Sequence, residues 1–439
     1  MLRQVTVKNG KLEGLPGNDP RVTVFKGIPF AKAPVGDLRW KRPFPADPWE
    51  GVLKAYKFGP ISVQDQPGVG TDIYCQEWHV DPDIPMSEDC LYLNVWTPAK
   101  RTDEKLPVLL WIFGGAFQWG YTAEMEFNGE RLARRGIIVV SVNYRLAALG
   151  FLAHPELTAE DPSCPSNFGL LDQKAGLDWV RENIEAFGGD PDNITIAGQS
   201  AGGGSVLNQL IDGDNYAAIK GAVILSGMID MPFDDDILRP HDLECAEKRG
   251  VDFFNYLGVK NLAEARAMDA FKIRDLYGQW AAENHPRVAP VIDGIHYKDN
   301  PLDLFKKNLR APVPVICGYT ADEFVMEGVN VVEKTVKETV KTALENGAGD
   351  LYVYEFNTDI PGDDKPGNFH SVDLWFWFET IFNCHRAYRG RHYELSRLMA
   401  NHLAEFVKHH DPNGLDDDGS PMPEWKKAEV DDLHIKLFN

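Results

Sequence analysis

The stretch ITIAGQSAGGGSVLNQLI, at residues 194–211, decides the fold of this chain. Its first five residues, ITIAG, form a short apolar run that is typical of a buried strand. Its last seven, SVLNQLI, are predicted to form a helix. Between the two, Gly198, Ser200 and Gly202 give the pattern G-x-S-x-G of a nucleophile elbow, a strained turn that exposes a reactive serine. Small residues are needed there because larger side chains would collide with the neighbouring strand and helix.

Flexible linkers and phosphate-binding loops are also rich in glycine, but both fit the flanking segments less well. A flexible linker would not lie between a buried strand and a helix. A phosphate-binding loop would carry the pattern G-x-x-x-x-G-K-[ST], and no lysine occurs in residues 194–211. We therefore interpret Ser200 as a candidate catalytic nucleophile.

The rest of the chain predicts an α/β protein with a large, mostly parallel, twisted central sheet and helices on both faces, because short apolar runs alternate with helical patterns. The predicted strands are residues 91–96, 108–113, 137–144, 194–198, 222–226, 314–318 and 351–356. The clearest predicted helices are residues 170–187 and 393–410. No internal repeat and no low-complexity linker occurs, so we expect one domain over residues 1–439.

The charge of the chain limits its partners. It has 45 basic and 66 acidic residues, which gives a formal net charge of −21. Such an acidic surface argues against nucleic acids and anionic membranes, because both carry phosphates. There is no run of about 18 apolar residues, and the N-terminal sequence MLRQVTVKNG has no apolar signal segment. We expect a cytoplasmic protein, or a secreted one whose signal has been removed.

A serine nucleophile needs a base and donors for the oxyanion that forms. The predicted strand at residues 108–113 leads directly into the sequence GGAF, residues 114–117. A glycine pair after a strand exposes successive backbone N–H groups, as an oxyanion hole requires. Together with Ser200, this favours a catalytic site over an ordinary tight turn.

Three long motifs resemble the type B carboxylesterases, the family of cholinesterases and liver carboxylesterases on the α/β-hydrolase fold. They are FKGIPFAKAPVGDLRW at residues 25–40, SEDCLYLNVWTP at 87–98, and NFGLLDQKAGLDWVRENIEAFGGDPDNITIAGQSAGG at 167–203. The resemblance covers nearly the whole chain. It implies one α/β-hydrolase domain and a Ser-Glu-His triad in that chain order.

The resemblance assigns the partners of Ser200. The motif GYTADEF places Glu323 at the position of the acid, with Asp322 as the alternative, and GNFHSVDLWFWF places His370 at the position of the base. Gly115, Ala116 and Ala201 then correspond to the oxyanion hole.

Other matched residues are expected to be structural. Arg39 with Glu88, and Arg145 with Asp172, correspond to buried ion pairs of the family. Ser226, in the sequence ILSG, is expected near the triad.

The cysteines leave one alternative open. The resemblance matches Cys90 to a half-cystine that could pair with Cys75, whereas a chain in a reducing compartment would keep both thiols reduced. All six cysteines lie outside C-x-x-C spacing, which excludes the common zinc patterns. Neither a metal nor an organic cofactor is implied.

The chain departs from the family pattern at several places. Ala116 stands where a third glycine is common, and Gln199 replaces a glutamate that often precedes the serine, which argues against cationic choline esters. Only 47 residues separate Glu323 from His370, so we predict a shortened helical region there, with one helix at residues 333–347. The predicted substrate contacts, which flank the catalytic loops, are Phe113, Phe117, Trp119 and Gln199.

These features predict a serine carboxylic ester hydrolase for neutral, small to medium hydrophobic or aryl esters. The alternative from another class is an inactive binding or adhesion protein on the same fold. Within enzymes, a feruloyl-type or lipase-like esterase remains an alternative. We expect a small-molecule ester as the partner, no nucleic acid or membrane, and a monomer or weak homodimer.

Overall fold

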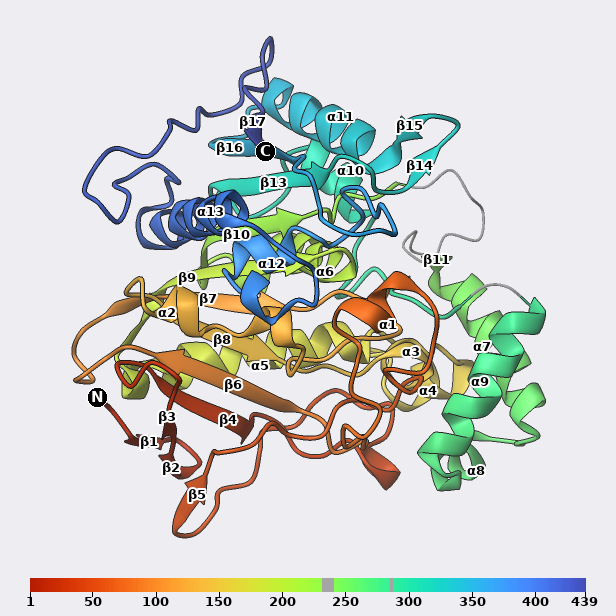
Figure 1. Cartoon of the computed structure of the whole chain (residues 1–439). Coiled ribbons are helices and arrows are strands. Elements are labelled where there is room, and N and C mark those ends of the chain that lie inside the picture. The colour runs from red at the N-terminus through yellow and green to blue at the C-terminus, as the bar shows by residue number, and fades with distance from the viewer. Residues whose placement is uncertain (231–240, 285–286) are drawn as a thin grey trace.

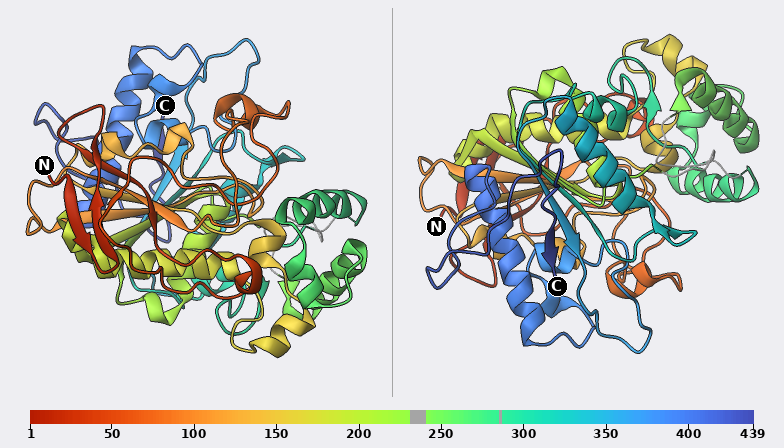
Figure 2. Two further views of the ribbon diagram at one scale, coloured as in Figure 1. Left: turned by 90° about the horizontal axis from the view of Figure 1, so that it is seen from below. Right: turned by 90° about the horizontal axis from the view of Figure 1, so that it is seen from above.

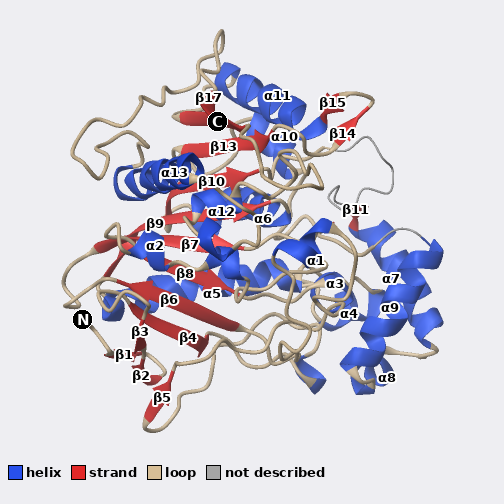
Figure 3. Cartoon of the chain, viewed as in Figure 1, coloured by secondary structure: helices blue, strands red, loops and turns tan. Residues whose placement is uncertain are grey.

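The computed structural model describes residues 1–230, 241–284 and 287–439. Its centre is a ten-stranded sheet with the strand order β17-β16-β13-β10-β9-β7-β8-β6-β4-β3 (Figures 1 and 3). The strands are β3 (Leu15–Pro16), β4 (Thr23–Pro29), β6 (Tyr92–Thr97), β7 (Leu106–Ile112), β8 (Ile138–Val142), β9 (Gly189–Gln199), β10 (Ile219–Leu225), β13 (Val315–Thr320), β16 (Leu351–Phe356) and β17 (Lys436–Phe438).

Most of this sheet is parallel. All neighbouring pairs from β8 through β7, β9, β10, β13 and β16 to β17 are parallel. The edge formed by β6, β4 and β3 is antiparallel. Every residue of β8 is buried, as expected for an apolar strand that helices cover on both sides.

Helices cover both faces of the sheet. Figure 2 shows α5 (Phe168–Asn183), α6 (Ala201–Ile211) and α11 (Val331–Glu345) on one face, and α12 (Leu374–Trp377) and α13 (Gly390–His409) on the other. This is the layered arrangement of an α/β fold with a single continuous core.

The other helices lie mainly in loops around the sheet. They are α1 (Ile73–Glu77), α2 (Glu130–Ala133), α3 (Ala147–Phe151), α4 (Pro155–Glu160), α7 (Leu243–Leu257), α8 (Leu262–Ala267), α9 (Ala270–Asn284) and α10 (Pro301–Lys306). Helices α7, α8 and α9 form a group beside the sheet (Figure 1). The hydroxyl of Tyr277 on α9 donates to Oε1 of Gln118, 2.8 Å away, in the loop after β7, so this group borders the carboxyl end of that strand.

Three small sheets complete the structure. The strands β1 (Gln4–Val7), β2 (Gly10–Glu13) and β5 (Val52–Lys54) form one, β11 (His241–Asp242) pairs with β12 (Val291–Ile292), and β14 (Val325–Met326) pairs with β15 (Val329–Asn330).

The predicted elements agree with this architecture. Each of the seven predicted strands overlaps a strand of the central sheet, and the predicted helices at 170–187 and 393–410 correspond to α5 and α13. Between Glu323 and His370 the one α-helix is α11, so the prediction of one helix in this region is confirmed. Within the described ranges, none of the helices combines the length and the apolar character that crossing a bilayer would need.

Candidate active site

Ser200 lies at the turn between β9 and α6, where it is the N-cap residue of the helix. Its backbone has φ 55° and ψ −126°, a conformation that costs free energy for a residue with a side chain. The turn is held by the Ser200 N–H, which donates to the carbonyl of Leu225 on β10 at 2.9 Å. The strain and the fixed turn are those of a nucleophile elbow.

Three glycines around Ser200 let the strand and helix approach each other. A Cβ on Gly202 would lie 2.2 Å from the carbonyl oxygen of Ile112, and one on Gly198 would lie 2.3 Å from the carbonyl oxygen of Gly202. A Cβ on Gly203 would lie 2.7 Å from Cα of Gly227. These glycines are therefore required by backbone packing and not by flexibility.

The side chains of Glu323 and His370 meet although 47 positions separate them. Nδ1 of His370 donates to Oε2 of Glu323 in a short hydrogen bond. The other carboxylate oxygen of Glu323 accepts from Oγ of Ser226 and from the backbone N–H of Thr320, each at 2.8 Å. Both side chains are buried. A carboxylate fixed in this way selects the ring tautomer with its proton on Nδ1, which makes Nε2 the nitrogen that can accept a proton.

Asp322, the alternative acid, points elsewhere. Its Oδ2 accepts from the backbone N–H of Asn368 at 2.7 Å, and the Asp322 N–H donates to the carbonyl of Asn368 at 3.1 Å. Asp322 therefore joins its own loop to the loop that carries His370, and the structure brings Glu323 to the imidazole.

Three backbone N–H groups lie unpaired near the nucleophile. In the described part of the chain, the N–H groups of Gly115, Ala116 and Ala201 donate no hydrogen bond. Gly115 and Ala116 have φ values of 103° and 53°, so the loop bends sharply as it leaves β7. Its turn is held by the carbonyl of Gly115, which accepts from the N–H groups of Gln118 and Trp119. The loop can therefore present free donors without losing its shape.

Gln199 contacts the base directly. Its amide nitrogen lies 3.2 Å from Nε2 of His370. With the proton on Nδ1, the ring nitrogen is an acceptor and the amide of Gln199 is the donor. No hydrogen bond joins Ser200 to the His370 ring in the described part of the structure.

The three predicted aromatic contacts lie in different surroundings. Phe117 lines a cavity beside Ser200. The ring of Phe113 is buried and stacks on Tyr144, with ring centroids 4.4 Å apart, and does not line that cavity. Trp119 lines a second cavity, where its indole N–H donates to Asp65 at 3.0 Å and Arg287 lies over the ring.

Sequence reasoning missed several residues around His370. Trp78 is buried and stacks on Phe369 with ring centroids 6.3 Å apart, so it supports the loop that carries the histidine. Tyr74 lies on α1, and burial together with the charge of Glu323 raises the pKa of its hydroxyl. Of these missed residues, only Asp373 lies in a motif that pointed to the site. It follows His370 by three positions in GNFHSVDLWFWF.

Asp373 is fully buried. Its Oδ2 accepts from the hydroxyl of Tyr354 at 2.8 Å and from the indole N–H of Trp377 at 3.1 Å, and its Oδ1 has no partner within the described ranges. Burial raises the pKa of this carboxyl to about 6, with the charge of Glu323 acting in the same direction.

Away from the site, both predicted ion pairs form. Arg39 lies 2.6 Å from Glu88, and Arg145 lies 2.7 Å from Asp172 in the core. Cys75 and Cys90 are both free thiols, so the disulfide alternative is wrong and the reduced one holds. Cys90 is buried, whereas Cys75 is partly exposed on α1.

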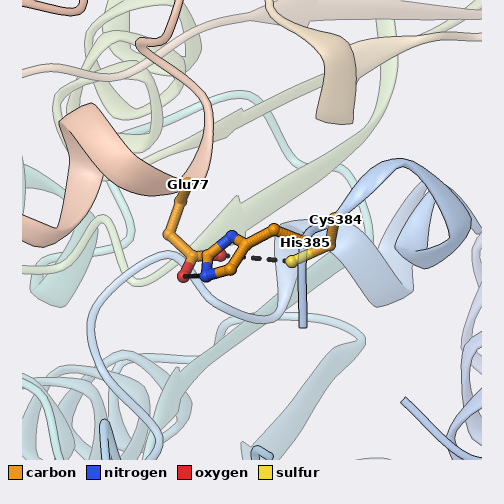
Figure 4. A group of neighbouring side chains, drawn as sticks. All are labelled: Glu77, Cys384 and His385. Atoms are coloured by element: carbon orange, nitrogen blue, oxygen red, sulfur yellow. Dashed lines mark hydrogen bonds and ion pairs between the residues drawn. The ribbon is translucent and has the colours of Figure 1, made fainter. Parts of the chain in front are cut away.

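One group of side chains resembles a metal site at first sight. Glu77, Cys384 and His385 place possible ligand atoms within 4.8 Å of one another (Figure 4). However, Nε of Arg386 lies 2.6 Å from the carboxylate of Glu77 and already neutralises it. Burial raises the pKa of the Cys384 thiol to about 12, which opposes the thiolate that binds metals. We interpret the group as a structural ion pair.

The chain is similar to known esterases in sequence. Residues 2–350 match the carboxylesterase family. The chain is 35% identical over 327 residues to fumonisin B1 esterase of Sphingopyxis macrogoltabida, covering 72% of this chain and 55% of that protein. It is 34% identical over 386 residues to para-nitrobenzyl esterase of Bacillus subtilis. This match covers 86% of this chain and 74% of that protein. The chain thus spans about half the length of the first relative.

The fold is similar as well. A solved structure of a PNB esterase aligns with 100% of this chain and 96% of its own, at a TM-score of 0.86 and 26% identity. This establishes the α/β-hydrolase fold. The match of residues 2–350 to the family and the similar fold together show that this chain belongs to the carboxylesterase family.

Proposed function

We propose that this chain is a carboxylic ester hydrolase in which Ser200, His370 and Glu323 form the catalytic triad. The observation that carries the proposal is the contact between the Glu323 carboxylate and Nδ1 of His370, close to a strained serine. In such an arrangement the imidazole is the general base and the serine is the nucleophile. The carboxylate stabilises the charge that the imidazole acquires.

In the first half of the reaction, Nε2 of His370 accepts the proton of the Ser200 hydroxyl as its oxygen bonds to the ester carbonyl carbon. The carbonyl oxygen becomes an oxyanion, which the N–H groups of Gly115, Ala116 and Ala201 stabilise. Removal of one such donor typically costs about 10²–10³ in rate. The imidazolium then gives its proton to the leaving alcohol, and an acyl-enzyme remains.

In the second half, water replaces the alcohol. His370 accepts a proton from the water as its oxygen bonds to the acyl carbon, and then returns the proton to Ser200 as the acid leaves. Glu323 stabilises the imidazolium in both halves. His370 thus carries out every proton transfer in the two halves of the reaction.

The substrate class rests on charge and on the relatives. A net charge of −21 and apolar residues such as Phe117 beside Ser200 favour neutral, small to medium hydrophobic or aryl esters. The names of the relatives, para-nitrobenzyl esterase and fumonisin B1 esterase, point to ester hydrolysis as well.

One observation favours the alternative of an inactive binding protein. Nε2 of His370 contacts the amide of Gln199 instead of the Ser200 hydroxyl. Hydrolysis therefore requires the Gln199 amide to leave that nitrogen when substrate binds. We favour hydrolysis because all the catalytic positions are filled.

A covalent label and a turnover assay test the proposal together. A fluorophosphonate should modify Ser200 in the folded protein, and His370→Ala should lower p-nitrophenyl acetate hydrolysis by roughly 10⁴-fold or more. His409→Ala is the control, because this exposed histidine on α13 pairs with Glu405 of the same helix. An unlabelled Ser200, or turnover retained by His370→Ala, would refute the triad.

A further inference from the structure

Two of the donors assigned to the oxyanion hole belong to a strained turn, residues 115–118. The closing bond of this turn runs from the N–H of Gln118 to the carbonyl of Gly115 at 2.8 Å. The two central residues, Ala116 and Phe117, have φ values of 53° and 60°. Turns with positive φ at both central positions are formed mostly by glycine, asparagine and aspartate, so alanine and phenylalanine are costly there. Contacts outside the turn must therefore hold it.

The carbonyl groups of the central residues make these contacts. The carbonyl of Phe117 accepts from the N–H of Ala147 at 2.8 Å. The carbonyl of Ala116 accepts from Nε2 of Gln118 at 3.3 Å. The N–H of Ala116 donates to no residue in the described part of the chain, so it stays available for an oxyanion. Since this free N–H and the bonded carbonyl belong to the same residue, the bond from Gln118 restrains the direction of the donor.

Gln118 is itself held by a closed ring of hydrogen bonds. Its Nε2 donates to the carbonyl of Val288 at 2.8 Å, and its Oε1 accepts from the hydroxyl of Tyr277 at 2.8 Å. The same hydroxyl accepts from the N–H of Val288 at 2.9 Å, which closes the ring. The carbonyl of Val288 can only accept, so the amide fits in one orientation. All three residues are buried, where such bonds are stronger than in water.

We propose that Gln118 is a positioning residue of the oxyanion hole, whose amide holds the turn so that the N–H groups of Gly115 and Ala116 face the oxyanion. The inference rests on the proposed hydrolase function and names the residues that orient its donors. Tyr277, on α9 beside the sheet, supports the rate through Gln118 and not by contact with the substrate.

A misdirected donor affects the transition state more than the bound ester. The oxyanion carries a full charge, whereas the carbonyl oxygen of the ester carries a partial one, so the donors stabilise the oxyanion more strongly. Both halves of the reaction pass through an oxyanion. Loss of the Gln118 contacts should therefore lower kcat and leave KM nearly unchanged. A residue needed for folding alone would lower the amount of active enzyme and not kcat per active site.

The first test is Gln118→Met in the full chain, since methionine has a similar length and no amide. With p-nitrophenyl acetate, kcat should fall by about 10²-fold, the lower end of the loss caused by removal of one donor. KM should change by less than ~3-fold. Complete fluorophosphonate labelling counts the active sites. The pH dependence of kcat/KM should keep its wild-type shape, because His370 and Glu323 are not among the described partners of Gln118.

The second test is Tyr277→Phe, which keeps the proposal falsifiable if Gln118→Met does not fold. This variant removes one hydroxyl and leaves the bond between Gln118 and Ala116 in place. Its kcat should fall by about 5- to 10-fold, as expected for one hydrogen bond. In the double variant, Tyr277→Phe should add little to the loss caused by Gln118→Met, because the hydroxyl acts through the amide.

Tyr256→Phe is the matched control. The hydroxyl of Tyr256, on α7, donates to Glu283 on α9 at 3.1 Å, and this bond is exposed. The control thus removes a tyrosine hydroxyl from the same group of helices without changing the ring around Gln118. It should keep the wild-type kcat and KM.

The outcomes separate the inference from the function on which it rests. If the wild type hydrolyses no ester, the proposed function fails and the inference fails with it. If the wild type is active and a folded Gln118→Met keeps its kcat, the inference alone is overturned. An unchanged kcat in Tyr277→Phe, a rise in KM without a fall in kcat, or an equal loss in Tyr256→Phe would overturn it as well.

Discussion

The two sides of Ser200 are built by different means. On the α6 side, backbone lies against backbone: positions 202 and 203 have no room for a Cβ. On the histidine side, two loops after β13 and β16 are joined by side-chain hydrogen bonds from Glu323, Asp322 and Asn368. The first side is fixed by the course of the chain, and the second by polar contacts that single substitutions can remove.

This difference predicts two kinds of damage. Substitutions on the α6 side must move backbone, so they should lower stability and disturb catalysis only as a consequence. Substitutions among the hydrogen bonds on the histidine side should lower the rate while the fold persists. Each of the following variants tests this division.

The largest effect is expected from Glu323→Gln. The neutral amide keeps the size of the side chain but removes the charge that fixes the tautomer and stabilises the imidazolium, so kcat should fall by about 10⁴-fold. That corresponds to about 5.5 kcal/mol in the barrier. Urea unfolding should show a stability close to that of the wild type.

Asp322→Asn is the control for that measurement. Its amide oxygen can still accept from the N–H of Asn368, so kcat should fall by less than ~10-fold. An equal loss in both variants would show that the rate depends on the loop and not on the acid at position 323.

The next largest effect is expected on the α6 side, from Gly202→Ala. Its Cβ would lie 2.2 Å from the carbonyl oxygen of Ile112, so β7 or α6 must shift. We expect the free energy of unfolding to fall by ~4 kcal/mol in urea titrations. Gly278→Ala, an alanine with open space in α9, should not lower it. A stable Gly202→Ala with a low rate would contradict the division.

The smallest effect is expected from Asp373. This residue is an exception to the division, because it lies on the histidine side yet should affect stability. Its pKa is raised from 3.8 to about 6 by burial, so the folded state holds a proton that the unfolded state releases between these values. The contribution to stability is therefore present below pH 3.8 and is lost as pH rises through 6, by about 3 kcal/mol.

Asp373→Asn removes this titration. As pH rises from 4 to 8, the free energy of unfolding of the wild type should fall by about 2–3 kcal/mol relative to that of the variant. A difference that stays constant over this range would show that Asp373 does not titrate there.

The turn at Ser200 could be predicted from the sequence because it is a local structure. A buried strand, small residues and a helix follow one another without interruption in residues 194–211. The meeting of Glu323 with His370 is not local, since 47 positions separate them, and only the resemblance to a family supplied it. The choice between Glu323 and Asp322 needed the contact of Asp322 with Asn368.

The surroundings of the predicted substrate contacts could not be read from the sequence, for a physical reason. Trp119 faces the second cavity because Asp65 and Arg287, far from it in the sequence, hold its ring. Phe113 stacks on Tyr144, which follows the neighbouring strand β8. A side chain in a loop takes its direction from such distant partners, which neither spacing nor composition reveals.

The glycines at positions 198 and 202–204 also have an evolutionary consequence. Three of them are closed to replacement, because a Cβ there would meet backbone. The fourth, Gly204, is open, and a single codon change can place alanine or valine there while Ser200 keeps its position. The descendants of this sequence can thus accept a small side chain at position 204 without first acquiring a compensating substitution elsewhere.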